Sequence, residues 1–295
     1  MKHAKYATAI AASLLLLGLV GCSSSGTSAG TSGTGDVAPS AFPANQFSPV
    51  IDCARTGHIT RAVCVGWNSV LPSAYNGWDG ALSDCESDAQ TWADKFRGYG
   101  IPTALLKTSN ATVARCRGAL RTALTGMKAG DDLLVSISGH GGQRADTDGD
   151  ESDHKDEYLC AYDQPVLDDT IHDWLNRVPA GVRITWICDT CNSGTMVRSA
   201  PPVVFRRRAI PRSFSGELIL MAGCNDGESS MSTGEGGQWT LSLSAMGPGQ
   251  GAEAKSPRKW FDLGAAYMML NFDNQIPVFT TYKASGDFIN GPLIK

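Results

Sequence analysis

Short apolar runs alternate with segments of helical spacing along most of this chain, and this alternation limits the possible folds more than any other feature. The runs have the length and β-branched content of buried strands, and the segments between them repeat apolar residues every three or four positions. Strands separated by helices of this length pair mainly in parallel and are covered on both faces. We therefore predict a three-layer α/β/α fold around a mainly parallel sheet. The predicted strands are 59–67, 101–106, 133–137, 182–188, 217–222 and 276–282, and the predicted helices are 81–99, 110–130, 168–178 and 260–272.

Two of the predicted strands end in motifs that carry reactive side chains. One strand runs into Ser138-Gly-His140-Gly-Gly142, and another runs into Asp189-Thr-Cys191-Asn-Ser-Gly194. Ligands of open α/β sheets bind beyond the carboxyl ends of parallel strands, so we expect the histidine and the cysteine to meet there. The pair predicts a cysteine-histidine hydrolase.

The chemistry explains why these residue types occur together. A free thiol has a pKa of about 8.5 and is mostly protonated at neutral pH, so it needs an adjacent base. His140 would take this proton and later protonate the leaving amine. The backbone N–H groups of Gly141 and Cys191 would face the oxyanion. Taken singly, Cys191 could be a small buried hydrophobe and His140 an ordinary loop histidine, but at matched strand ends they favour catalysis.

The N-terminus predicts export and lipid attachment. Residues 1–21 combine two lysines with an apolar stretch that is short for a bilayer span, which is typical of a secretory signal. The stretch ends in Leu19-Val-Gly-Cys22, which resembles a bacterial lipobox, so Cys22 would carry the lipid; an ordinary cleaved signal is the alternative. Residues 22–45, rich in Ser, Gly and Thr, would form a tether and 46–295 the folded domain. Because Ser23 replaces a retention aspartate, we expect the cell envelope, at the outer membrane facing the periplasm in a Gram-negative cell.

Charge and cysteine content narrow the possible partners. The leader holds two of the 25 basic residues and none of the 29 acidic ones, so the remaining net charge is −6 and predicts no nucleic-acid partner. We expect a monomer. Nine cysteines are present. If Cys22 carries the lipid and Cys191 is the nucleophile, seven remain, and an odd number leaves at least one thiol unpaired. Cys53 and Cys64 are candidates for a disulfide, whereas Cys160 and Cys188 are equally well explained as buried thiols.

Four ordered motifs together resemble the caspase-like cysteine peptidases, in their metacaspase and bacterial orthocaspase branch. They are the two strand-end motifs, the acid-rich stretch 150–163 and Asp168-Asp169-Thr-Ile-His172; segments 82–88 and 221–226 extend the similarity. The resemblance covers residues 59–282 and implies a caspase-like fold and a cysteine endopeptidase. Thr190 and Asn192 depart from the family, which often has a serine or cysteine and a histidine there, and neither departure removes the dyad.

The resemblance also implies an acidic specificity pocket that accepts arginine or lysine. The matching positions are Cys85, Asp88, Ser138 and Asp189. Two carboxylates suit a desolvated guanidinium or ammonium group. The alternatives are a solvated helix residue for Asp88 and a carboxylate that orients the histidine, as in a triad, for Asp189. We predict cleavage of peptide or protein substrates after Arg or Lys.

The acidic segment 146–157 raises the question of calcium. It places carboxylates at several EF-hand positions, but position six is Glu151 and no helix precedes the segment, so an EF-hand is not expected. The resemblance instead implies an activating Ca²⁺ site at Asp156, Asp168 and Asp169. Arg198 lies where a fourth carboxylate would fall and would repel the ion. The chemistry itself requires no cofactor, and a solvated hairpin or loop is the alternative.

A basic tract follows the nucleophile motif. Arg206, Arg207 and Arg208 lie before the next predicted strand and would be a self-cleavage site for an Arg/Lys-directed peptidase; an ordinary basic surface loop is the alternative.

Two other functions stay open. One is a catalytically silent envelope lipoprotein that binds a partner, which the presence of both reactive residues disfavours. The other is an acyl-transfer enzyme, a ligase or transpeptidase, in which an amine resolves the thioester.

Overall fold

The main feature of the fold is a six-stranded sheet with the strand order β2-β1-β3-β7-β8-β9. The computed structural model describes residues 57–147, 149, 154–197, 214–247, 256–272 and 275–293. Five strands run parallel to one another, and β9 is antiparallel to β8. The strands are β1 (Thr60–Gly66), β2 (Thr103–Lys107), β3 (Asp132–Ser138), β7 (Arg183–Asp189), β8 (Glu217–Ala222) and β9 (Val278–Tyr282).

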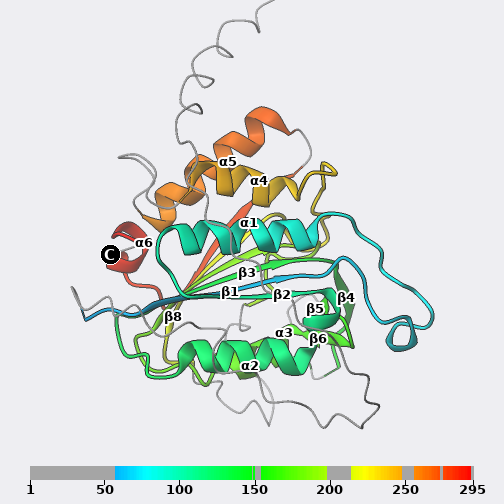
Figure 1. Ribbon diagram of the computed structural model, residues 1–295, viewed down its shortest axis with the longest axis horizontal. Coiled ribbons are helices and arrows are strands. Elements are labelled where there is room, and N and C mark those ends of the chain that lie inside the picture. Colours follow the sequence, from blue (N-terminus) through cyan, green and yellow to red (C-terminus); the bar gives the residue numbers. More distant parts are fainter. Residues whose placement is uncertain are drawn as a thin grey trace, which may run out of the picture. The chain divides into compact units, whose positions relative to one another are not determined.

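Helices cover both faces of this sheet (Figure 1). Every residue of β3 and β7 is buried, as expected for strands covered on both sides. Neighbouring residues of β3 enter different cores, because Leu133 and Val135 face one apolar cluster and Leu134 faces the other. The predicted three-layer α/β/α fold is therefore confirmed. One face carries α1 (Cys85–Gly98), α4 (Gln238–Met246), α5 (Pro257–Asn271) and α6 (Gly286–Asn290), and the other carries α2 (Val113–Leu124) and α3 (Asp168–Leu175).

A second, antiparallel sheet was not among the predicted strands, although a hairpin was one alternative for the acidic segment 146–157. It consists of β4 (Gly141–Ala145), β5 (Lys155–Cys160) and β6 (Pro165–Leu167), in the order β4-β5-β6. Its first strand has the sequence GGQRA, which lacks the apolar alternation that marks a half-buried strand. The sheet begins directly after His140, and the backbone N–H of Cys160 donates to the His140 carbonyl over 3.0 Å. The small sheet thus fixes the backbone of the predicted base.

Helices α1, α2 and α3 are shorter than predicted, since α3 ends at Leu175 rather than at 178 and the other two begin later. Helix α1 begins at Cys85 rather than 81, because residues up to Asp84 belong to a loop that contains the 3-10 turn η1 (Pro72–Ala74). The N-cap of α2 is Thr112, whose side chain accepts from the backbone of Arg115, so the assignment of Asn110 was wrong. Asn110 ends the 3-10 turn η2 (Thr108–Asn110).

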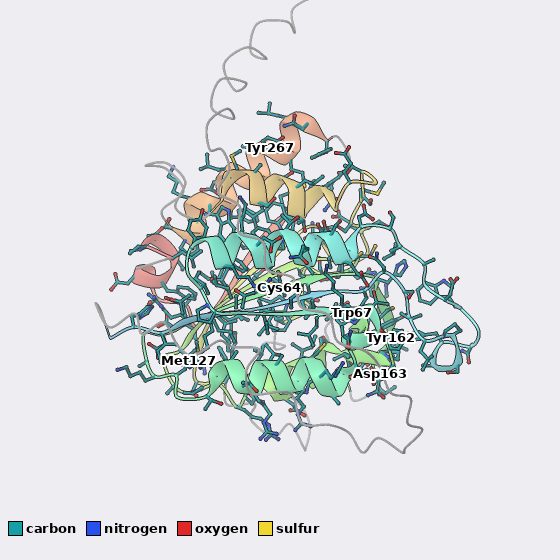
Figure 2. All side chains as sticks on the ribbon, viewed as in Figure 1. Cys64, Trp67, Met127, Tyr162, Asp163 and Tyr267 are labelled. Atoms are coloured by element: carbon teal, nitrogen blue, oxygen red, sulfur yellow. The ribbon has the colours of Figure 1, made fainter. Side chains whose placement is uncertain are left out.

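Cys64, a candidate for a disulfide, is not part of one in the structure. Cys64 lies in the middle of β1, is fully buried, and is a free thiol (Figure 2). Its burial raises the pKa of the thiol to about 12. Cys160 and Cys188 are buried thiols, as the alternative explanation for them held. Cys53 lies outside the described residues.

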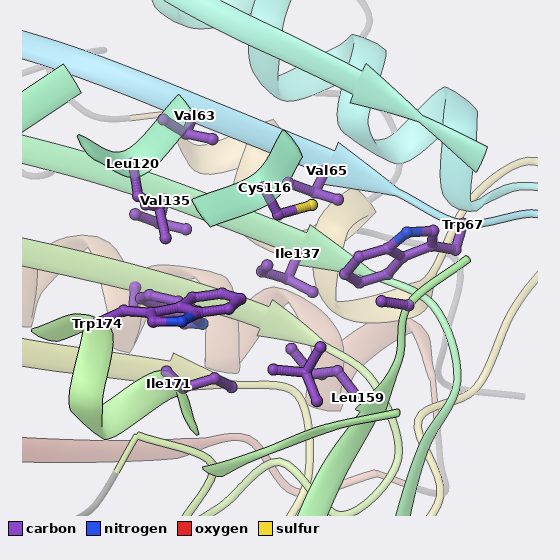
Figure 3. Close-up of a pocket in the computed structure, with 13 residues that line it drawn as sticks. Val63, Val65, Trp67, Cys116, Leu120, Val135, Ile137, Leu159, Ile171 and Trp174 are labelled. Atoms are coloured by element: carbon purple, nitrogen blue, oxygen red, sulfur yellow. The ribbon is translucent and has the colours of Figure 1, made fainter. Parts of the chain in front are cut away.

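A small apolar cavity of about 20 Å³ lies between the central strands and helices α2 and α3 (Figure 3). Val65, Ile137 and Trp174 are among the residues that line it. The space offers no polar partners to a water molecule, so it is a gap in core packing rather than a ligand site.

Several predicted features fall outside the described residues. These are the signal segment 1–21, the tether 22–45 with Cys22, Arg198, and the tract Arg206, Arg207 and Arg208. In the part of the chain that the structure describes, no helix has the length and hydropathy needed to cross a membrane.

Candidate active site

The two strand-end motifs lie side by side at the carboxyl edge of the main sheet. Strands β3 and β7 are hydrogen-bonded neighbours, and Ser138 is in register with Asp189. The loops that carry His140 and Cys191 therefore leave the sheet from adjacent positions. They also touch, because a Cβ at Gly141 would overlap the carbonyl oxygen of Cys191. The predicted base and nucleophile are brought to one place, and the side chain of Cys191 is half-buried.

The imidazole of His140 is enclosed by a loop that precedes α1. The Trp78 ring lies 4.8 Å from the His140 ring, centroid to centroid, with an angle of 52° between the planes. Burial lowers the pKa of His140, and a hydrogen bond to the backbone of Gly80 opposes this shift in part. A lowered pKa keeps the imidazole neutral at neutral pH, which is the form a general base needs. Neither Trp78 nor Gly80 was predicted, because no sequence motif connects this loop to the dyad.

The nucleophile loop is held in a tight turn by the segment after β8. Asn192 has φ of 52°, in the left-handed region that asparagine tolerates better than most residues. Its backbone N–H donates to the Glu228 carbonyl over 3.0 Å, and its side-chain oxygen accepts from the Gly227 N–H over 2.9 Å. The departure from the family pattern at Asn192 thus has a local reason, since its amide fastens this turn.

Two other thiols lie near Cys191. Burial is the main cause that raises the pKa of Cys160 and of Cys224 to about 11 each, and the nearby Cys191 adds to both shifts. Both groups therefore stay protonated at neutral pH. Cys191 is the only half-buried cysteine among the seven that the structure describes, which makes it the accessible thiol of the three.

The four residues predicted to form the pocket are also brought together. The Ser138 hydroxyl donates to Asp88 over 2.7 Å, and Cys85 lies against the same serine. Asp189 is close enough to Asp88 to raise its pKa. Asp84, which was not predicted, joins them, so three carboxylates that are each at most 5% exposed share one region.

Hydroxyl and backbone N–H groups, rather than cations, hold these carboxylates. Asp189 accepts from the Thr240 N–H over 2.7 Å and from the Ser230 hydroxyl, and Asp88 accepts from the Gly237 N–H over 3.1 Å. These amides belong to the start of α4, where the positive end of a helix favours negative charge. Within the described ranges, none of the three carboxylates pairs with Lys, Arg or His.

The compensation of this charge is incomplete. Burial, followed by the proximity of Asp189, raises the pKa of Asp88 to about 7. Burial likewise raises the pKa of Asp189. The Asp189 carboxylate has no hydrogen bond to His140 among the described residues, and this disfavours the triad alternative. The three carboxylates together therefore favour the binding of a cationic group that the described residues do not supply.

The residues implied as calcium ligands are arranged differently. The Asp156 carboxylate pairs with Arg144 over 3.2 Å, and Asp168 accepts from the backbone N–H of Asp169 at the start of α3. Burial raises the pKa of Asp156, and the nearby Asp146 and Asp169 add to the shift, which the bond to Arg144 opposes. Among the described residues, no group of three or more His, Cys, Asp and Glu side chains is placed to hold a metal ion. These side chains do not make a calcium donor set as they lie, and calcium activation stays a prediction.

Comparisons of sequence agree with the site geometry. Residues 60–200 match the family described as metacaspase, peptidase C14 domain. Metacaspase-3 of Arabidopsis thaliana is 30% identical over 199 residues, which cover 58% of this chain and 53% of that protein. Metacaspase-1 of Cryptococcus neoformans var. neoformans serotype D is 35% identical over 150 residues, which cover 46% of this chain and 32% of that protein. The chain thus spans about a third to a half of the length of these curated relatives.

Comparisons of structure agree with the fold. The crystal structure of protein GSU0716 from Geobacter sulfurreducens is similar with a TM-score of 0.64 and 28% identity, covering 78% of this chain and 96% of that one. Caspase-1 from Spodoptera frugiperda has a TM-score of 0.53 at 13% identity, covering 76% and 86% of the two chains. The second likeness concerns the fold alone, and it confirms the predicted caspase-like architecture.

Proposed function

From the premise that this chain is a homologue of metacaspase-type cysteine peptidases, we propose that it is a cysteine endopeptidase that cleaves after arginine or lysine. One observation carries the specificity: three buried carboxylates lie beside the nucleophile loop with no cationic partner among the described residues. Asp189 is two residues from Cys191, so a basic side chain bound there would hold its own carbonyl group near the thiol. Binding energy would thus be used to position the scissile bond.

The proposed reaction uses the dyad in two half-reactions. His140 takes the proton of the Cys191 thiol, and the sulfur attacks the carbonyl carbon of the bound arginine or lysine. The backbone N–H groups of Gly141 and Cys191 stabilise the resulting oxyanion. His140 then gives its proton to the amine as the C–N bond breaks, leaving a thioester. Water attacks this thioester with His140 again as base, which releases the acid and restores the thiol.

A panel of fluorogenic peptides with Arg, Lys or Asp at the primary position tests this function. We expect turnover of the Arg and Lys peptides, none of the Asp peptide, and loss of turnover in Cys191→Ala and in His140→Ala. Equal or faster turnover of the Asp peptide would contradict the proposed pocket. Adding a competing amine and measuring the product masses separates hydrolysis from acyl transfer. A ligase or transpeptidase would join the amine to the peptide as an amide, whereas hydrolysis yields the free acid.

The basic tract and the acidic cluster together motivate a proposal of self-processing. Cleavage at Arg206, Arg207 or Arg208 would separate a segment with both reactive residues from the remainder. Purified protein should then run as two fragments, and Cys191→Ala should stay intact. Equal clipping of the alanine variant would point to a contaminating protease.

Two further proposals concern the location of the enzyme in the cell and its activation by a metal ion. Attachment of lipid at Cys22 would place the enzyme at the cell envelope. The Cys22→Ser variant should then be absent from the membrane fraction of the cell.

Activation by calcium would appear as activity lost to a chelator and restored by Ca²⁺. Unchanged activity under chelation would eliminate it.

A further inference from the structure

We propose that Trp78 is a positioning residue for His140, whose indole fixes the plane of the imidazole and shields it from water. The proposal rests on the proposed function in one respect, namely that His140 is the base for Cys191. Trp78 lies on the loop 68–84 and is far from both catalytic motifs in the sequence. Its contact with the imidazole is the only aromatic contact of His140 among the described residues.

The loop that carries Trp78 is anchored rather than loose. The Tyr75 hydroxyl donates to the Ala161 carbonyl over 2.6 Å, and the Leu71 N–H donates to the Tyr162 carbonyl over 2.7 Å. Both acceptors directly follow β5, whose last residue, Cys160, also bonds to the His140 backbone. The loop and the histidine therefore share one support, so the indole can hold the imidazole in a fixed place.

The imidazole is held by two features of this loop. The indole of Trp78 packs on its ring, and the ring makes a hydrogen bond to the backbone of Gly80. Gly80 has φ of +57°, and a Cβ there would lie 3.3 Å from the indole and 3.1 Å from Val70. The positive φ and the close indole both favour a glycine at this position. The Tyr75 ring also contacts the indole of Trp78. The centroids of these two rings are 6.0 Å apart and their planes meet at 70°, an edge-to-face arrangement.

The exposure of Trp78 makes a purely structural role a poor explanation. Trp78 is 45% exposed, so core packing does not require it. What the indole does cover is the base of the dyad. Three segments packed around His140 carry titratable side chains: Cys191, whose carbonyl contacts Gly141, Cys160, whose N–H bonds to the His140 carbonyl, and Tyr75, whose ring neighbours Trp78. The pKa shift of His140 itself arises from burial and from the hydrogen bond to Gly80. The shielding by the indole is therefore the property that a substitution would change most.

The test compares Trp78→Ala and Trp78→Phe with Leu71→Ala, a matched control at a 37% exposed residue of the same loop. We expect Trp78→Ala to lower kcat for the Arg peptide about ten-fold, because the base loses its alignment, while KM changes less than about two-fold. The acid limb of the pH profile should move to higher pH, since a solvated imidazole protonates more readily. Trp78→Phe should recover most of both effects, and Leu71→Ala should behave as the wild type.

A second readout does not depend on peptide cleavage. The rate at which iodoacetamide alkylates Cys191, measured on that peptide by mass across pH, reports how well His140 activates the thiol. A shifted alkylation profile in Trp78→Ala supports the positioning role even if no peptide is turned over, and that outcome would count against the proposed function alone. An unchanged kcat and an unchanged profile would overturn the proposal, as would a rise confined to KM, which would mean substrate contact. Urea midpoints of all three variants exclude misfolding as the cause, and Trp78→Phe supplies the comparison if Trp78→Ala does not fold.

Discussion

Asp88 is the residue whose charge is most sensitive to conditions near neutral pH. It is buried at the start of α1 beside Asp189 and Asp84, with Cys85 and Ser138 in contact, and its pKa is raised to about 7. Below this pH the carboxyl is neutral and attracts a substrate cation less. Above it, the native state must hold a charge that burial disfavours.

For Asp88 we predict opposite effects on binding and on stability. KM for the Arg peptide should rise as pH falls through about 7 in the wild type, and should be higher and nearly independent of pH in Asp88→Asn. The unfolded carboxyl ionises near its ordinary pKa, so the wild type loses stability as pH rises from about 4 to about 7. Asp88→Asn should therefore be the more stable protein at pH 8, by on the order of a few kcal/mol in urea unfolding.

Asp94→Asn is the matched control for this prediction. Asp94 lies on the same helix with a side chain that is 64% exposed. Both its KM profile and its stability should follow the wild type within about 0.5 kcal/mol. A wild-type KM that is flat between pH 6 and pH 8 would contradict the assigned role of Asp88.

The dyad could be predicted from the sequence at the residue scale, but much of its surroundings could not. His140 and Cys191 follow apolar runs directly, and the strand-end rule places such residues at one edge. Asp84 and Trp78 reach the site from the loop 68–84 and Ser230 from the segment after β8, and nothing in their local sequence indicates that contact. Their roles depend on long-range packing, such as the bond between Asp84 and Ser232, which are 148 residues apart.

Among the structural elements, the strands were the easiest to predict. Their β-branched apolar runs are local signals, and they place both catalytic loops. The small sheet β4-β5-β6 was missed because β4 contains glycine, glutamine and arginine rather than alternating apolar residues. Helix α4 was missed too, although its first turn binds Asp189. Its residues are buried on several sides, so the single apolar stripe that marks a surface helix is absent.

At the element scale we predict that Gly141→Ala disables the site without unfolding the protein. The start of β4 packs directly on the Cys191 carbonyl, so an added methyl must push the two catalytic loops apart. We expect kcat/KM for the Arg peptide to fall about 100-fold, as a displacement of this kind does. Gly98→Ala, at a glycine of α1 with no neighbour near its Cβ position, should retain wild-type activity. Far-UV circular dichroism should match for all three proteins, and a fully active Gly141→Ala would contradict the close approach.

In the molecule as a whole, stability and chemistry lie at opposite edges of the sheet. At the edge where the parallel strands begin, Asp132 is 1% exposed and pairs with His58 over 2.5 Å and with Arg183 over 2.6 Å. The dyad and the acidic cluster lie at the other edge. Substitutions in the two places should therefore have separable effects.

We predict that Asp132→Asn destabilises the fold but not the site. Removing one partner of a buried ion pair leaves Arg183 uncompensated, which costs about 3–5 kcal/mol. The urea midpoint should fall accordingly, while kcat/KM of the folded fraction at low temperature stays near that of the wild type. Asp262→Asn, which breaks an exposed pair with Arg258 on α5, is the control and should cost at most about 1 kcal/mol. Equal losses in the two variants would show that the Asp132 pair is not a major support.

The pairing of β3 with β7 has a consequence for how such a chain can be altered. The segment 132–194 contains both strands, the base and the nucleophile, so the reactive pair is inherited as one contiguous piece of sequence. The groups that hold Asp88 and Asp189, by contrast, include Ser230, Gly237 and Thr240 from the later part of the chain. A chimera that exchanges only residues 230–247 with those of a relative keeps Gly227 and Glu228, which hold the nucleophile turn. It should therefore keep its reactivity toward thiol reagents and acquire a different preference among substrates. Recombination could therefore change the substrate preference of this fold without changing the reactivity of its cysteine-histidine pair.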